Sequence, residues 1–95
     1  MTTPQTIWKY SLPITDEYTI DLSPVAQVLA VDMAPSGGHI EFWAAVWPDQ
    51  PAKPRRFYVR GTGHPLFPAV PEKHVGTVVD RARGHVWHVF DGGPA

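Results

Sequence analysis

The residues best suited to chemistry gather in one short string and in the segment before it. Gly61-Thr62-Gly63-His64-Pro65 sets two glycines around a hydroxyl, so its backbone can turn tightly and present N–H groups to an anion. Arg56 and Arg60 precede it and offer bidentate donors to phosphate, while an aromatic ring between them can stack on a base. The sequence therefore predicts a small-anion site formed by Arg56, Tyr58, Arg60, Gly61, Thr62, Gly63 and His64.

A plainer interpretation of this string stays open. It is also typical of a glycine-rich turn between two strands, with the arginines on a solvated face. It is not a phosphate-binding Walker A loop, because no Lys-Ser or Lys-Thr pair and no helix start follow the glycines.

Five histidines invite a metal-binding interpretation, but their spacing does not favour one. His85 and His88 are three positions apart, so on a strand their side chains point to opposite faces. No His-rich or His-Glu-x-x-His motif is present. We expect no metal and no other cofactor, and we interpret the histidines as polar residues at strand edges.

The last two strands predict a hairpin whose register has electrostatic consequences. If Asp80 faces His85, the pairs that follow are Val78 with Trp87, Gly76 with Val89 and His74 with Asp91. The two acid–histidine pairs would then raise the pKa values of His85 and His74.

Tryptophan supplies the third notable group, with four residues. The segment from His39 to Trp47 is apolar on both faces, which suggests that another subunit covers one of them. We therefore predict Trp43, Trp47 and Trp87 as interface residues and the protein as a homo-oligomer, as is common for small domains without disulfides or metals. The alternative is that these rings all belong to one crowded core.

Catalytic arrangements are weak in this sequence. Ser11, Ser23 and Ser36 lie beside proline or glycine in strand ends and turns, without a nucleophile elbow. The carboxylates are scattered, with no pair predicted to face inward. We predict no catalytic residue and a protein that is not an enzyme.

The elements that must position these residues are β-strands. Apolar residues alternate along the chain, and 11 prolines in 95 residues leave little room for helices. We predict one all-β domain over residues 1–91, an antiparallel meander of about six to seven short strands forming a sandwich or a partly open barrel, with a flexible tail over residues 92–95. The predicted strands are Ile7 to Leu12, Tyr18 to Leu22, Val25 to Met33, His39 to Trp47, Arg55 to Gly61, His74 to Asp80 and His85 to Asp91.

Composition excludes several classes of protein. Lys plus Arg number 8 and Asp plus Glu number 9, so the basic excess typical of proteins that bind duplex nucleic acid is missing. Without cysteine, disulfides, thiolate zinc sites and thiol nucleophiles are impossible. No signal-peptide pattern and no apolar run of about 20 residues is present, so we expect a cytoplasmic protein without a membrane partner.

Several strings together resemble a known family. They are Ile7-Trp8-Lys9-Tyr10-Ser11-Leu12, Phe42-Trp43-Ala44, Gly61-Thr62-Gly63-His64-Pro65, Val75-Gly76-Thr77-Val78 and His85-Val86-Trp87-His88-Val89-Phe90. Over nearly its whole length the chain resembles a family of small bacteriophage proteins, a domain of unknown function. The resemblance implies a viral accessory protein in the host cytoplasm and carries over no catalytic residue.

Residues and resemblance together predict a non-enzymatic protein that binds or sequesters a host component in the infected bacterium. A small anionic, nucleotide-like ligand fits the string around Gly61. Two alternatives stay open. One is a host-protein-binding inhibitor that uses exposed tryptophans and a free strand edge, and the other is a structural or assembly protein of the virion.

Overall fold

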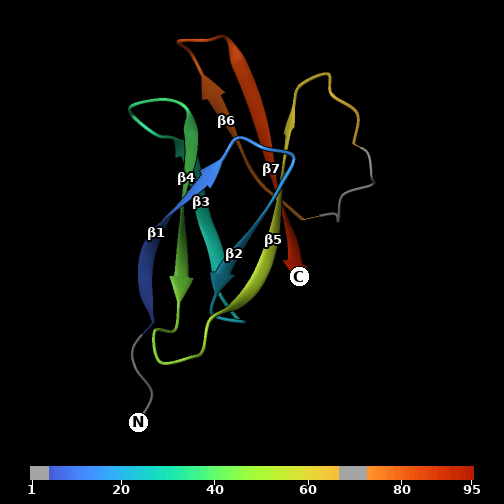
Figure 1. The fold of residues 1–95 in the computed structure, drawn as a ribbon. Helices are drawn as coiled ribbons and strands as arrows, with labels where there is room; N and C mark the ends of the chain where they lie inside the picture. Colours follow the sequence, from blue (N-terminus) through green and yellow to red (C-terminus); the bar gives the residue numbers. More distant parts are fainter. Residues whose placement is uncertain (1–4, 67–72) are drawn as a thin grey trace.

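The computed structural model describes residues 5–66 and 73–95, which form seven β-strands (Figure 1). Every strand pairing is antiparallel, and the described residues contain no helix. The predicted all-β class and the number of strands are confirmed. The strands are β1 (Thr6–Pro13), β2 (Glu17–Leu22), β3 (Gln27–Met33), β4 (His39–Val46), β5 (Lys53–Gly61), β6 (Lys73–Asp80) and β7 (His85–Pro94).

The strands form two sheets that pack face to face. One has the order β1-β4-β3 and the other the order β2-β5-β7-β6, and neither closes into a barrel. Only β3–β4 and β6–β7 pair as sequential hairpins, whereas β1 pairs with β4 and β2 pairs with β5. The sandwich is therefore confirmed, but its strand order departs from a sequential meander, because alternation marks a strand without naming its partner.

The core lies between the sheets and is centred on two phenylalanines. Phe42 on β4 stacks on Tyr10 with ring centroids 5.2 Å apart, and it contacts Phe57 of the other sheet at 5.0 Å. Aliphatic side chains surround this contact and remove a continuous apolar volume from water, which is the main stabilising term of a small domain. The buried core residues are Leu12, Leu22, Ala26, Ile40, Phe42, Ala44, Val46, Phe57, Val59, Val78 and Val89.

The last hairpin follows the predicted register for three of its four pairs. Asp80 faces His85, Val78 faces Trp87 and Gly76 faces Val89. The register shifts between His74 and Gly76, so His74 lies opposite Phe90, and the predicted His74–Asp91 pair does not form. The shift leaves Lys73 opposite Asp91.

Residues 92–95, predicted as a flexible tail, lie against β5. Gly93 and Pro94 belong to β7 and pair with Arg56 and Arg55. The N–H of Ala95 donates to the carbonyl of Pro54 at 3.1 Å. Gly93 has a φ of 77°, a left-handed conformation that favours glycine over other residues.

A search of the described ranges for a helix long and apolar enough to cross a lipid bilayer finds none.

Candidate functional site

The two arginines of the predicted anion site already interact within the fold, Arg56 with the Glu17 carboxylate and Arg60 with main-chain carbonyls. Arg56 Nε lies 3.1 Å from a carboxylate oxygen of Glu17, and the hydrogen bond with Tyr58 and the Glu17 charge raise the pKa of Arg56. Arg60 is only 5% exposed, and its Nη1 donates to the carbonyl of Asp16 at 2.6 Å and to that of Val59 at 3.0 Å. Tyr58 is also buried, and the guanidinium of Arg60 lies 5.5 Å from its ring centroid. Arg56 is therefore paired with Glu17, and Arg60 contacts the Tyr58 ring and the backbone.

The glycine string forms a tight turn. The N–H of His64 donates to the carbonyl of Gly61 at 3.0 Å, and the N–H of Thr62 donates to that of Val86 at 3.1 Å. Gly63 has a φ of 88°, which explains the second glycine. Two of the N–H groups expected to meet an anion are thus already bonded, one within the turn and one to β7. Three of the seven predicted residues, namely Gly61, Thr62 and His64, share a pocket of about 290 Å³ with His85 and Trp87.

A chain of hydrogen bonds runs outward from this turn across β7 and β6. Thr62 Oγ1 lies 2.8 Å from Nε2 of His88, and the other ring nitrogen of His88 lies 3.1 Å from Oγ1 of Thr77. The same hydroxyl lies 3.1 Å from Nε2 of His74. These hydrogen bonds join the turn after β5 to β7 and β6. In residues 5–66 and 73–95, no three His, Asp or Glu side chains are placed to hold a metal ion.

The three tryptophans predicted as interface residues lie in three separate places. Trp43 pairs with Lys9 and Ala30 across its sheet. Trp47 lines a groove beside β1 and β2. Trp87 packs against the core, with the His85 ring at 5.5 Å, so it fits the alternative that these rings belong to the core.

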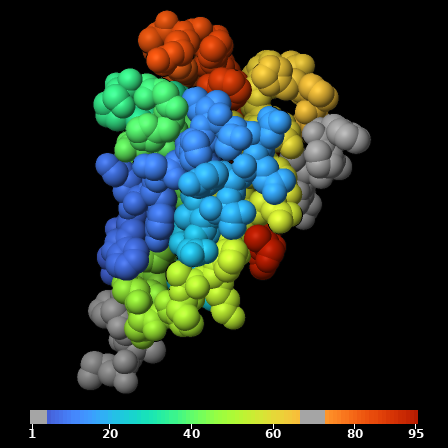
Figure 2. Space-filling view, in the orientation of Figure 1, coloured from blue at the N-terminus to red at the C-terminus, as the bar shows by residue number. Residues whose placement is uncertain are grey.

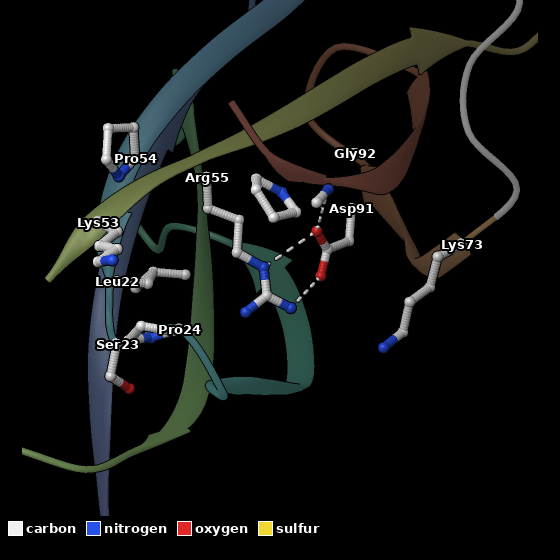
Figure 3. Close-up of a pocket in the computed structure, with 11 residues that line it drawn as sticks. Leu22, Ser23, Pro24, Lys53, Pro54, Arg55, Lys73, Asp91 and Gly92 are labelled. Atoms are coloured by element: carbon white, nitrogen blue, oxygen red, sulfur yellow. Dashed lines mark hydrogen bonds and ion pairs between the residues drawn. The ribbon is translucent and has the colours of Figure 1, made fainter. Parts of the chain in front are cut away.

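A different cavity has a lining that is both charged and apolar. It has a volume of about 360 Å³ and opens at one end of the sandwich, beside β2, β5 and β7 (Figure 3). Leucine and proline side chains supply apolar wall, and an arginine, two lysines and one aspartate supply charge. We call it the Arg55 pocket. Its lining residues are Leu22, Ser23, Pro24, Lys53, Pro54, Arg55, Lys73, Asp91, Gly92, Gly93 and Pro94.

An almost fully buried ion pair fixes this pocket. Arg55 and Asp91 lie on neighbouring strands, and their side chains are 13% and 2% exposed. The guanidinium grips the carboxylate with two nitrogens, Nε with Oδ1 at 3.1 Å and Nη2 with Oδ2. Its Nη1 donates to the carbonyl of Ala26 at 2.6 Å. This bidentate geometry is the strong form of an arginine–carboxylate contact and holds the guanidinium in one orientation.

The electrostatics keep Asp91 ionised. Burial by itself raises the pKa of the Asp91 carboxyl, but the hydrogen bonds from Arg55 and Gly93 and the charges of Arg55 and Lys73 outweigh it, so the pKa is lowered. Lys53 and Lys73 lie on opposite sides of the ion pair in the view of Figure 3. Among the described residues that line the pocket, Asp91 offsets only one of three cations, so these residues together carry a net positive charge. The pocket is thus suited to an anionic group with an apolar part.

The sequence contained a faint signal for this site. Arg55 shares a face of β5 with Phe57 and Val59, and Asp91 shares a face of β7 with Val89. A charged residue on the apolar face of a strand needs a buried partner, because an unpaired charge there is costly. The site predicted from the sequence was instead based on Arg56 and Arg60, which lie on the opposite face of β5 from Arg55.

Comparison with known proteins gives one match. The family model described as "Domain of unknown function (DUF7352)" matches residues 3–95. No curated protein and no solved structure matches the chain. Because the match spans almost the whole sequence, the chain belongs to the family of the domain of unknown function DUF7352.

Proposed function

We propose that this protein is a non-enzymatic binding protein that takes up a small anionic, nucleotide-like ligand in the Arg55 pocket. The observation that supports this most is that Arg55, Lys53 and Lys73 line one partly apolar cavity, and the one carboxylate among its described lining residues is already paired. A volume of about 360 Å³ lies within the range of small-ligand sites.

Different residues of the pocket would contribute different interactions with the ligand. Arg55 is held by Asp91 and by the Ala26 carbonyl, so little side-chain entropy is lost when a ligand meets it. Lys53 and Lys73 are exposed and provide mobile ammonium groups for a phosphate or carboxylate. The prolines and the Leu22 side chain provide apolar wall for a flat ring.

Binding fits this pocket better than catalysis does. Asp91 is held as a carboxylate by Arg55 with its pKa lowered, which makes it a weak base. Ser23, the only hydroxyl side chain among the lining residues, accepts the N–H of Trp47 at 3.2 Å. None of the described residues that line the cavity is a histidine that could activate a nucleophile.

The biological setting follows from the resemblance to bacteriophage proteins. In that setting the protein would act as an accessory protein in the host cytoplasm, sequestering a nucleotide-derived host component. Sequestration needs affinity without turnover, and a preformed pocket with a fixed arginine provides that.

Calorimetric titration with adenosine monophosphate, cyclic adenosine monophosphate and inorganic phosphate tests the proposal. We expect the wild type to bind at least one nucleotide and the Lys53→Gln/Lys73→Gln variant to bind it about tenfold more weakly, because two charge-assisted contacts are lost at exposed positions. The control is Lys9→Gln/Arg81→Gln, which removes the same charge from residues outside the pocket and should bind like the wild type. Absence of binding by the wild type, or equal affinities of the two variants, would contradict the proposal.

A further inference from the structure

A second concavity lies where β1, β2 and the segment 46–52 meet, and Figure 2 shows these segments side by side on one face. Its volume is about 220 Å³, and its lining includes the rings of Trp8, Tyr10, Trp47 and Pro48. We call it the aromatic groove. Its side chains other than Leu22 and Ser23 are separate from those of the Arg55 pocket.

The core holds the Tyr10 ring, and a hydrogen bond fixes the backbone at Trp47. Tyr10 stacks on Phe42, which is fully buried, with an interplanar angle of 18°. The main-chain N–H of Trp47 donates to Oγ of Ser23 at 3.2 Å, which ties the start of the 47–52 loop to the end of β2. The groove is therefore preformed, and a ligand that fills it loses little of its binding free energy to reordering.

Trp8 is the exposed ring of the groove. It is 47% exposed although it lies on a strand, and it is two residues from Tyr10, so the two side chains project about 7 Å apart on the same side of β1. An indole exposed to this degree keeps an apolar face and a ring N–H donor available to a ligand.

The groove and the Arg55 pocket have opposite charge. Asp21 is the one charged side chain among the groove's lining residues, and it is exposed. An anion is therefore repelled here, whereas a lysine or arginine beside an apolar segment is attracted.

We propose that the aromatic groove binds a proline-rich segment of a partner protein in the polyproline II conformation, with a basic residue beside its prolines. Aromatic-lined grooves suit such segments, because flat rings pack against pyrrolidine rings and the extended backbone loses little entropy on binding. The main-chain carbonyls of the bound segment can accept the indole N–H of Trp8. The Asp21 carboxylate complements the charge of the segment's basic residue. This site goes beyond the proposed anion binding and does not depend on it.

The test is a tryptophan-fluorescence titration of the whole protein with a short synthetic peptide that carries two Pro-x-x-Pro turns followed by arginine. We expect Trp8→Ala to weaken binding about tenfold, because a central aromatic anchor is lost, and Asp21→Asn to weaken it about threefold. Leu29→Ala, a residue 48% exposed on β3, is the matched control and should bind like the wild type.

Peptide variants test the same point without changing the protein. Replacing the prolines with alanine should abolish binding, and replacing the arginine with glutamate should weaken it. No binding by the wild type, or equal binding of the alanine peptide as expected for simple strand addition, would overturn the proposal. A dimer in sedimentation experiments that buries Trp8 would also overturn it. The Lys53→Gln/Lys73→Gln variant should keep its peptide affinity, which separates this proposal from the anion site.

Discussion

Two arginines on β5, Arg55 and Arg60, are both largely buried but have different surroundings. Arg55 faces the gap between the sheets, pairs with the carboxylate of Asp91 and borders a pocket with two further cations. Arg60 lies on the other face of the strand, and its Nη1 donates to two main-chain carbonyls. A buried arginine therefore indicates a binding site only where its own partner leaves a concave surface and uncompensated charge beside it.

The largest expected effect concerns the ion pair. Asp91→Ala leaves the Arg55 guanidinium buried without its carboxylate, so we expect the free energy of unfolding to fall by about 3–5 kcal/mol. Denaturant unfolding followed by tryptophan fluorescence measures this change. Asp21→Ala removes an exposed carboxylate and should change stability by less than about 0.5 kcal/mol. Equal effects of the two substitutions would contradict the role given to the ion pair.

Arg60→Met should be tolerated better than Asp91→Ala. It removes hydrogen bonds to neutral carbonyls and leaves no buried charge unpaired, so we expect a loss of about 1–2 kcal/mol in the free energy of unfolding. The same denaturant experiment applies. A loss as large as that of Asp91→Ala would remove the distinction between the two arginines.

The free energy of unfolding should also depend on pH. The Asp91 pKa is lower in the folded than in the unfolded protein, so its contribution is present above the unfolded value of about 4 and is lost as the pH falls through the folded pKa. Asp80 acts in the same direction, because hydrogen bonds from Arg83 outweigh the effect of burial and lower the pKa of Asp80. We expect unfolding free energies measured from neutral pH downward to decrease below about pH 4, and less steeply in Asp91→Asn.

The strands were predictable because alternation is local, whereas the pocket depends on contacts between distant segments. The sequence predicts a strand from Arg55 to Gly61, and the structure confirms it as β5, with Phe57 and Val59 in the core. The Arg55–Asp91 pair requires β5 and β7 to be neighbours. Two register shifts, one after Arg56 and one after His74, determine which residues of β5 and β6 lie opposite each residue of β7. A bulge adds one residue to one strand and leaves no fixed mark in the residue pattern.

The glycine string illustrates the opposite case, a distinctive sequence with a local structural role. Gly63→Ala should lower the free energy of unfolding by about 1 kcal/mol, because alanine is strained at the φ of 88° found there. The Gly63→Ala substitution should leave nucleotide affinity unchanged when affinity and unfolding are measured on the same protein preparation. A selective loss of nucleotide binding would instead restore this turn as an anion site.

Amide NMR of the protein titrated with adenosine monophosphate tests most directly which end of β5 binds the anion, the Arg55 pocket or the glycine turn. If the Arg55 pocket binds the nucleotide, the largest chemical-shift changes will fall on Arg55, Lys73, Gly92 and Gly93, which line it. Changes concentrated on Gly61, Thr62, Gly63 and His64 would contradict the account and place the anion at the glycine turn.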